Sequence, residues 1–412
     1  MQFPPSAGGL PALDVAALPD RVRRRLAERV REARPTGAVP GGYLYLPEVA
    51  AARAAGLRAV LPDRWRLCFA VKANSFPPVL AALAAEVDGF EVASAAEVAA
   101  ARAALPGGLA VAAGPGKTVA VLRALVAHGV DLVNVESALE LLRLDGVAAE
   151  AGRRVRAALR VNPSAAAPAG ALTMGGVPSA FGIPEPDVGA VLDLAASCRF
   201  VDVAGIHVHA ASGVLDAAAY AGYVASCLAL AGRLMRGRRL DVVDVGGGIG
   251  VPFGADPGAA PFDLERFGEL VAELSPPAGA EVVLEPGRYL AAECGWYAAE
   301  VTDVKHAYGT SYAVLHGGIN HFQLPASWDL VHRFAVVPVE DWPAGVPRPE
   351  VAGGPVTVVG ELCTPEDTLA RDARVTRLRA GDLVVFPLAG AYGWEFAMPA
   401  FLGHPPATRE VA

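Results

Sequence analysis

Residues 67–112 read LCFAVKANSFPPVLAALAAEVDGFEVASAAEVAAARAALPGGLAVA, three short apolar runs separated by two alanine-rich segments. Short apolar runs bounded by Gly or Pro are typical of buried strands, and alanine-rich segments of this length are typical of helices. A strand, a helix and a second, parallel strand make one βαβ unit. The stretch therefore predicts a parallel sheet covered by helices.

The same alternation extends from about residue 50 to about residue 290. Eight βα units in this span fit a closed (β/α)8 barrel of the TIM type better than an open sheet, so the fold class is α/β. The eight strands are predicted near Leu67–Val71, Gly89–Val92, Leu109–Ala112, Leu132–Val135, Ala157–Val161, Val203–Val208, Val242–Val245 and Val282–Leu284.

Two further segments flank the predicted barrel, which we place at residues 43–290. Residues 1–42 contain a charged stretch, Asp20–Arg34, that is typical of a solvated helix, followed by a Pro/Gly break; we interpret them as an N-terminal arm. Residues 291–412 alternate short apolar runs with turns, which predicts a mostly β C-terminal domain of barrel or sandwich type. A strand near residues 43–46 is a candidate to join it.

Composition limits the classes of function. The net charge of −8 argues against nonspecific nucleic-acid binding, which needs a basic surface. There is no uncharged, proline-free run of about 18 apolar residues and no basic head followed by an apolar stretch, so we expect no membrane partner and a cytoplasmic location. Five scattered cysteines suggest neither disulfides nor a zinc site. A small-molecule partner is the expectation.

In (β/α)8 barrels the chemistry lies on the loops that follow the C-terminal strand ends. Polar or glycine-rich residues stand at the ends of the predicted strands, so the barrel would gather them at one mouth. They are Lys72, Glu91, Gly114–Gly116, Glu136, Arg160–Asn162, His207–His209, Gly246–Gly248 and Glu285–Arg288.

Lys72 is one of only three lysines in the chain and ends an apolar strand. Burial disfavours the ammonium form, which would suit a Schiff-base nucleophile. A lysine whose amine simply reaches solvent from the strand end is an equally weighted alternative.

The turn Gly246-Gly247-Gly248 follows a strand that contains Asp244. Consecutive glycines let backbone N–H groups close around an anion such as a phosphate. The spacing is not GxGxxG, so a dinucleotide site is weakly supported, and a plain glycine-rich turn remains open.

Glu285 would be a buried carboxylate that needs a cationic or N–H partner, and a pyridinium nitrogen would supply one. Arg288 could hold a phosphate or carboxylate through its planar guanidinium. The alternative is a Glu/Arg ion pair that ties the barrel end together.

His207 and His209 should lie on one side of their strand. No further ligand of suitable spacing accompanies them, so no metal is predicted. Stacking of one imidazole on a flat cofactor and an ordinary core histidine both remain possible.

The motifs AVKAN, GFEVAS, GIHVHAAS, DVGGGIG, EPGR, GELCTPED and GAY stand in this order between about residues 43 and 405. Together they resemble the alanine-racemase-fold (fold type III) decarboxylases that depend on pyridoxal 5′-phosphate (PLP), the group of ornithine and diaminopimelate decarboxylases. The resemblance implies that Lys72 holds PLP as a Schiff base near Glu91, that His209 stacks on the ring and that Glu285 pairs with its nitrogen. The candidates for cofactor binding are Lys72, Glu91, Arg160, His209, Ser212, Gly246, Gly247, Gly248, Glu285, Gly287, Arg288 and Tyr392.

Cys363 lies in the GELCTPED motif. The resemblance implies that this cysteine comes from a partner subunit and protonates the carbanion carbon after CO2 leaves. A homodimer with shared active sites follows. The alternative is a buried, inert cysteine.

The substrate is less defined. Where diaminopimelate decarboxylases would have an Arg-Pro-x-x-Tyr element and an acidic residue after the catalytic cysteine, this chain has HGGINHFQLP at 316–325 and Thr364. The stretch GGINHFQLPASWD and, near the C-terminus, GAYGWEFAMPAFLGHP are more similar to the decarboxylases of carboxylate-siderophore pathways, which act on citryl-diaminopropionate-like or related amino-acid conjugates. Asn320, His321 and Gln323 are the candidate substrate contacts.

Other functions fit parts of the pattern. A diaminopimelate- or ornithine-type decarboxylase of primary metabolism is one alternative. An amino-acid racemase of the same fold is another, although an arginine would then face the pyridine nitrogen instead of Glu285. A non-catalytic PLP-binding protein would need neither Cys363 nor Tyr392.

Overall fold

The computed structural model describes residue 6 and residues 8–165, 172–173, 175–254, 259–328 and 330–412. Contacts between residues divide the chain into two compact units. The barrel unit comprises residues 50–251 and 260–290, and the β-rich unit comprises residues 1–49, 252–259 and 291–412. This division groups the N-terminal segment with residues 291–412, whereas the borders drawn from the sequence at residues 42 and 290 stay predictions.

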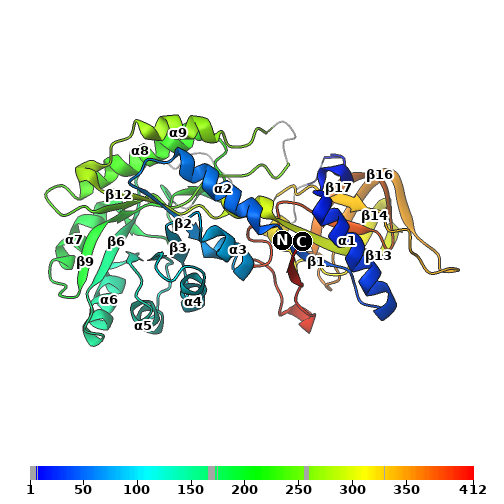
Figure 1. Ribbon diagram of the computed structural model, residues 1–412, viewed down its shortest axis with the longest axis horizontal. Coiled ribbons are helices and arrows are strands. Elements are labelled where there is room, and N and C mark those ends of the chain that lie inside the picture. Colours follow the sequence, from blue (N-terminus) through cyan, green and yellow to red (C-terminus); the bar gives the residue numbers. More distant parts are fainter. Residues whose placement is uncertain (1–5, 7, 166–171, 174, 255–258, 329) are drawn as a thin grey trace. The chain divides into compact units, whose positions relative to one another are not determined.

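The barrel unit is a closed ring of eight parallel strands, and each predicted strand is present (Figure 1). Around the ring the order is β2, β3, β4, β5, β6, β9, β11, β12, and the pairing of β12 with β2 closes it. The predicted (β/α)8 fold is therefore confirmed. The strands are β2 (Trp65–Ala70), β3 (Gly89–Val92), β4 (Leu109–Ala112), β5 (Leu132–Val135), β6 (Val155–Asn162), β9 (Val201–His207), β11 (Val242–Asp244) and β12 (Glu281–Leu284).

Helices cover the outside of the ring, and side-chain caps fix where several of them begin. Ser94, Thr118, Ser137 and Asp216 each accept a hydrogen bond from the backbone N–H three residues ahead, which satisfies a donor that the first helical turn leaves unpaired. The helices are α2 (Pro47–Val60), α3 (Pro77–Leu83), α4 (Ala95–Ala104), α5 (Val119–Ala127), α6 (Ala138–Glu150), α7 (Val188–Ala195), α8 (Ala217–Leu234) and α9 (Leu264–Ala272).

Small and β-branched side chains from the strands fill part of the barrel. They form a buried cluster that includes Cys68, Val111, Ala204, Val242 and Val283. Their burial leaves the polar residues of the C-terminal strand ends as the chemistry-bearing part of the unit.

α8 is the one helix among the described residues that is long and apolar enough to cross a membrane. Half of this segment is buried, and the Tyr223 hydroxyl on α8 donates to the carbonyl of Val208 at 2.9 Å. These contacts are those of a helix packed on a barrel.

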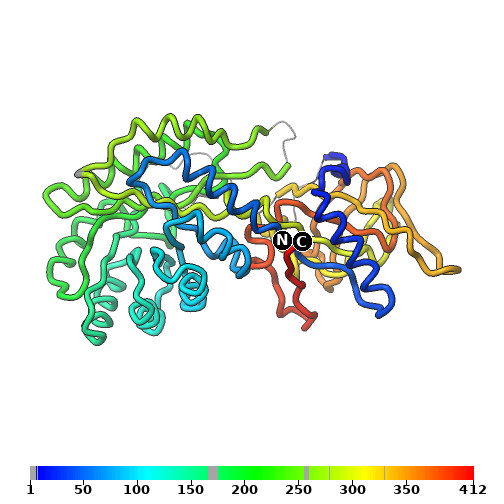
Figure 2. The backbone as a smooth tube through the Cα atoms, in the orientation of Figure 1, coloured from blue at the N-terminus to red at the C-terminus, as the bar shows by residue number. Residues whose placement is uncertain are grey.

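The β-rich unit is built on a mostly antiparallel sheet in the order β15, β18, β13, β14, β16, β17. β1 pairs antiparallel with β13 and parallel with β19, so the blue and red ends of the chain meet here (Figure 2). The strands are β1 (Gly42–Tyr45), β13 (Gly295–Ala307), β14 (Thr310–Leu315), β15 (Ala335–Val337), β16 (Glu350–Val359), β17 (Thr368–Arg379), β18 (Leu383–Phe386) and β19 (Arg409–Val411).

The charged N-terminal stretch forms helix α1 (Asp20–Ala33), but this helix is not fully solvated as its charge pattern suggested. Val22 and Leu26 are fully buried in a cluster with Trp296 and Leu383. Arg29 is also buried and pairs with Glu410 at 2.7 Å. The apolar residues four positions apart form a narrow stripe that the surrounding arginines obscure.

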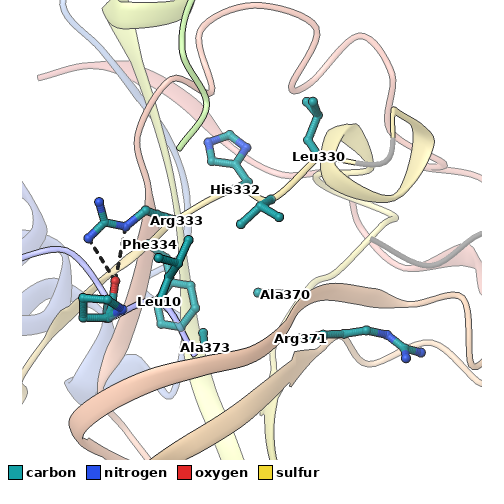
Figure 3. A pocket seen from close by; sticks show the side chains of 11 residues that line it. Leu10, Leu330, His332, Arg333, Phe334, Ala370, Arg371 and Ala373 are labelled. Carbon is teal, nitrogen blue, oxygen red and sulfur yellow. Dashed lines mark hydrogen bonds between the residues drawn. The ribbon is translucent and has the colours of Figure 1, made fainter. Parts of the chain in front are cut away.

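The segment before α1 is also tied to this unit. Arg333 donates two hydrogen bonds to the Pro11 carbonyl, at 3.0 and 3.2 Å, and the backbone of residues 10–13 bonds to Phe334 and Arg374. Leu10, Arg333 and Phe334 are among the residues that line the small pocket shown in Figure 3.

Candidate active site

Lys72 and Glu91 lie side by side because β2 and β3 are neighbours. The register places Ala70 opposite Glu91, and Lys72 follows β2 in a short 3-10 turn. The Lys72 Nζ lies 2.6 Å from Glu91 Oε2, and Glu91 is 1% exposed. The Lys72 side chain itself is 42% exposed, so the burial expected from its apolar strand is not observed. The amine projects beyond the strand end into the mouth, where a carboxylate meets it.

The turn after β11 has a backbone that side chains would disrupt. Gly246 and Gly248 have φ angles of +65° and +144°, which favour glycine. A Cβ on Gly246 would lie 2.5 Å from the His209 Nδ1, and one on Gly247 would lie 2.5 Å from the carbonyl oxygen of Glu285. The turn is thus a tight cradle for which glycine is required.

His209 is held against this cradle. The Gly247 N–H donates to its Nδ1 at 3.1 Å, which leaves the proton of the neutral ring on Nε2. Burial, with the charges of Lys72 and Arg160 as smaller contributions, lowers the pKa of His209 to about 3. The ring is therefore neutral and fixed in orientation. Ser212 ends the short strand β10 (Ala211–Ser212) three residues further on.

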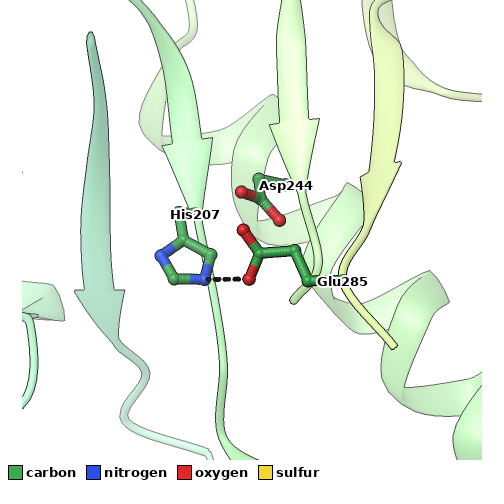
Figure 4. Close-up of side chains that lie close together, drawn as sticks. All are labelled: His207, Asp244 and Glu285. Carbon is green, nitrogen blue, oxygen red and sulfur yellow. Dashed lines mark ion pairs between the residues drawn. The ribbon is translucent and has the colours of Figure 1, made fainter. Parts of the chain in front are cut away.

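Three buried polar side chains meet at the ends of β9, β11 and β12: His207, Asp244 and Glu285 (Figure 4). The His207 Nε2 lies 3.7 Å from Glu285 Oε2. Burial, reinforced by the neighbouring Asp244 and Glu91, raises the pKa of Glu285 well above its usual range, and burial raises the pKa of Asp244 to about 6. The pKa of His207 is lowered, mainly by burial, so the imidazole is neutral.

The same three side chains bring ligand atoms within 4.8 Å of one another, close enough to surround a cation. Two buried carboxyl groups this close together do not readily both ionise, and burial raises the pKa of each. One of the two carboxyls therefore holds a proton.

Arg160, at the end of β6, is buried and donates to the Oε1 of buried Glu136 at 2.7 Å. Its guanidinium lies 4.9 Å from the centroid of the Phe181 ring. This fixes the arginine as part of the wall of the mouth. Gly287 and Arg288 are also buried, directly after Glu285.

The remaining candidates lie in the β-rich unit, and Asp367 brings two of their loops together. The buried Asp367 carboxylate accepts the N–H of Ile319 at 2.7 Å and that of Leu362 at 2.8 Å. Asn320 and His321 therefore lie on a loop fixed beside the one that carries exposed Cys363.

Polar contacts continue this linkage. The Asn320 amide donates to Glu361 Oε1 at 3.1 Å, while the His316 Nδ1 lies 2.9 Å from Glu361 Oε2. His321 bonds through Nε2 to the Pro405 carbonyl at 2.9 Å. Gln323 precedes the short helix α11 (Leu324–Ser327).

Tyr392 has a φ of +59°, which is unusual for a residue other than glycine. Its ring packs edge-on against Trp328 at 4.9 Å. Strained backbone of this kind is often found at functional sites.

Sequence reasoning singled out neither Asn134 nor Asp367. Asn134 donates to Asp244 at 2.8 Å across the barrel. An amide inside the otherwise apolar run LVNV was the available signal, because alternation places Asn134 on the face shared with buried Leu132. Asp367 had no comparable signal, because its partners are backbone N–H groups of distant loops.

The barrel residues fit PLP on several independent observations. An amine stands beside a carboxylate, a glycine cradle leaves no room for side chains, and the buried Glu285 Oε1 and both ring nitrogens of His207 have no hydrogen-bond partner among the described residues. The amine suits the aldehyde of PLP, the glycine turn suits its phosphate, and the buried carboxyl suits its ring nitrogen.

These features define a pyridoxal-dependent decarboxylase. The pyridoxal-binding domain of that family matches residues 49–292, and the chain belongs to the family. Its cofactor is PLP, and its activity is PLP-dependent decarboxylation.

Similar proteins include 2-[(L-alanin-3-ylcarbamoyl)methyl]-2-hydroxybutanedioate decarboxylase of Staphylococcus aureus, 35% identical over 84% of this chain and 87% of that one. Diaminopimelate decarboxylase of Aquifex aeolicus is 30% identical over 90% and 85% of the two chains. The crystal structure of diaminopimelate decarboxylase from Helicobacter pylori complexed with L-lysine has a TM-score of 0.79 at 25% identity and covers 90% of this chain and 91% of that one.

Proposed function

We propose that the enzyme removes the α-carboxylate from an amino acid whose side chain carries a hydroxydicarboxylate, as in the citryl-diaminopropionate-like conjugates of carboxylate-siderophore pathways. The observation that carries this proposal is the 35% identity, over most of both chains, with a decarboxylase named for an alanine unit joined through C3 to such an acid. We also expect a cytoplasmic location.

The substrate loop supports a conjugate of this kind. Loop 316–325 offers imidazole and amide groups in place of the arginine and tyrosine expected for a simple distal carboxylate. The buried Asn320 Oδ1 has no hydrogen-bond partner among the described residues, so it is available to a hydroxyl or amide donor. Asn320, His321 and Gln323 are the proposed contacts.

On the cofactor side, we propose that Lys72 binds PLP covalently and that Glu91 orients its amine. Glu285 would face the ring nitrogen, and His209 would pack on the ring. The remaining groups would hold the cofactor and its phosphate: Arg160, Ser212, Gly246, Gly247, Gly248, Gly287, Arg288 and Tyr392. PLP, when bound, supplies an electron-withdrawing ring for the electron pair that departing CO2 leaves behind.

We propose a homodimer in which Cys363 of one subunit serves the barrel of the other, delivering the proton that replaces the carboxylate. Exposure of Cys363 in the single chain supports this role. The stretch after Tyr392 also exposes a run of large apolar side chains, which is typical of an association surface. They are Phe396, Met398, Phe401 and Leu402, each at least 40% exposed.

The test is CO2 release by purified holoenzyme from three substrates: the citryl conjugate of L-2,3-diaminopropionate, meso-diaminopimelate and L-ornithine. We expect the conjugate to have a kcat/KM at least about 30-fold higher, since two or three specific hydrogen bonds of about 1–1.5 kcal/mol each are at stake. Asn320→Ala should lower kcat/KM for the conjugate but not for ornithine. Preference for ornithine or meso-diaminopimelate would refute the proposal.

Diaminopimelate decarboxylation is the second candidate. It is favoured by the structural match to a diaminopimelate decarboxylase bound to L-lysine. Turnover of meso-diaminopimelate to lysine, without activity on the conjugate, would establish it.

A further inference from the structure

The Glu285 carboxyl has a buried partner that no part of the proposed function uses. Asp244, the last residue of β11, is fully buried, and its carboxyl and that of Glu285 have oxygens within 4.8 Å of each other. Asn134 is likewise fully buried and donates to Asp244 Oδ2 at 2.8 Å. Because β5 and β11 are not neighbours in the ring, this hydrogen bond crosses the barrel interior.

The hydrogen bonds around this pair are unequal. The N–H of Gly246 donates to Asp244 Oδ1 at 2.9 Å, so both oxygens of Asp244 accept N–H donors. The Glu285 Oε1 has no hydrogen-bond partner among the described residues. Donors favour the ionised form of the group that they contact, and burial disfavours ionisation of a group without them. Asp244 is therefore the anion of the pair, and Glu285 holds the shared proton.

Other titratable groups near Glu285 do not change which of the two carboxyls holds the proton. Glu91 raises the pKa of Glu285, whereas Lys72 lowers it, and both effects are smaller than burial. His207 does not compete for the proton, because burial keeps its imidazole neutral. The Cys68 thiol is buried and stays protonated as its pKa is raised.

We propose that Asp244, held as an anion by Asn134, is a positioning residue that keeps a proton available on Glu285 and so sets the protonation of the ring nitrogen when PLP binds. This rests on the proposed pairing of Glu285 with that nitrogen. When PLP is bound, the Glu285 carboxyl would supply the proton of the ring nitrogen, and the carboxylates of Glu285 and Asp244 would together favour the cationic form of the ring. Without the second anion, the ring nitrogen should lose its proton at a lower pH.

The test uses holoenzyme reconstituted with 15N-labelled PLP, in which the NMR shift of the ring nitrogen reports protonation. In the wild type we expect the protonated position to persist at pH 8. In Asp244→Asn the resonance should move toward the unprotonated reference. Asp216→Asn, at the exposed cap of α8, is the matched control and should leave the resonance unchanged. An unchanged shift in Asp244→Asn would overturn the inference.

Glu285→Gln distinguishes a failure of the pairing between Glu285 and the ring nitrogen from a failure of the positioning role of Asp244. If it leaves the nitrogen shift unaltered, the pairing of Glu285 with the ring fails and the inference fails with it. If Glu285→Gln moves the shift and Asp244→Asn does not, only the positioning role of Asp244 is lost.

A second measurement covers the case in which Asp244→Asn does not retain cofactor. Glu285 gives the folded apoprotein about one extra proton near neutral pH, whereas the buried neutral imidazoles of His207, His209 and His332 act in the opposite direction. The change of the denaturant midpoint from pH 6 to pH 8 should therefore be more positive in apo Asp244→Asn than in the apo wild type, because the amide can donate to an ionised Glu285. An equal pH dependence of the midpoint in both proteins would contradict the proposal.

Discussion

Gly247→Ala tests whether the turn after β11 is the phosphate site. The new Cβ would lie 2.5 Å from the carbonyl oxygen of Glu285, and an ordinary contact would require the two atoms to separate by about 1 Å more. Glu285 cannot simply withdraw, since it follows β12 and its N–H bonds to the Gly246 carbonyl at 2.8 Å. The turn itself must therefore shift, at a cost of about 1–3 kcal/mol.

A turn displaced by this amount would lose at least one N–H contact to an anion, worth about 1.5–3 kcal/mol. Affinity for PLP should fall between about 10- and about 150-fold. Titration of the apoenzyme with PLP and with pyridoxal, which lacks the phosphate, measures this directly. The loss should be much smaller for pyridoxal.

Gly146→Ala is the control. Gly146 is exposed in α6 and a Cβ there meets nothing within 4 Å, so the helix should gain up to about 1 kcal/mol with no change in PLP affinity. Wild-type affinity of Gly247→Ala for PLP, or an equal loss for pyridoxal, would refute the assignment of the cradle.

Two further predictions concern the β-rich unit and the assembly. Burial lowers the pKa of His332 from 6.5 to about 4, so the unfolded chain binds this proton first and stability is lost as pH falls from 6.5 toward 4. His332→Gln, which can still donate to the Pro387 carbonyl, should reduce that loss by up to about 3 kcal/mol in chemical denaturation of the apoprotein, and an unchanged pH profile would contradict the burial argument. Mixing inactive Lys72→Ala with inactive Cys363→Ala subunits should restore about a quarter of wild-type activity if sites are shared in a dimer. No recovery after verified subunit exchange would exclude sharing.

The sequence was sufficient for the barrel because its strands are short apolar runs separated by clear helix and turn signals. Lys72, Glu91 and Glu285 were predictable as residues of one mouth, since each follows a parallel strand. For the Lys72 side chain, burial and exposure both stayed open, because an apolar strand says nothing about the direction in which its last side chain points. The buried face of α1 was hidden by the arginines around Val22 and Leu26.

Interactions between distant segments were the least predictable part. Asn134 and Asp244 are 110 positions apart, and only the closure of the ring brings their side chains together. Asp367 joins loops through backbone N–H groups, which carry no residue-specific pattern. Hydrogen bonds of this kind follow from the folded geometry and not from local sequence.

The carboxylate of Asp367 has one more implication, for enzyme engineering. It accepts hydrogen bonds from the backbone N–H groups of Ile319 and Leu362, so these two bonds do not depend on the side chains of the two loops. The side chains of residues 320–323 could therefore be replaced by those of another decarboxylase. The position of the Cys363 thiol relative to this loop should stay unchanged. New selectivity could then be installed without rebuilding the loop that carries Cys363, the proposed proton donor.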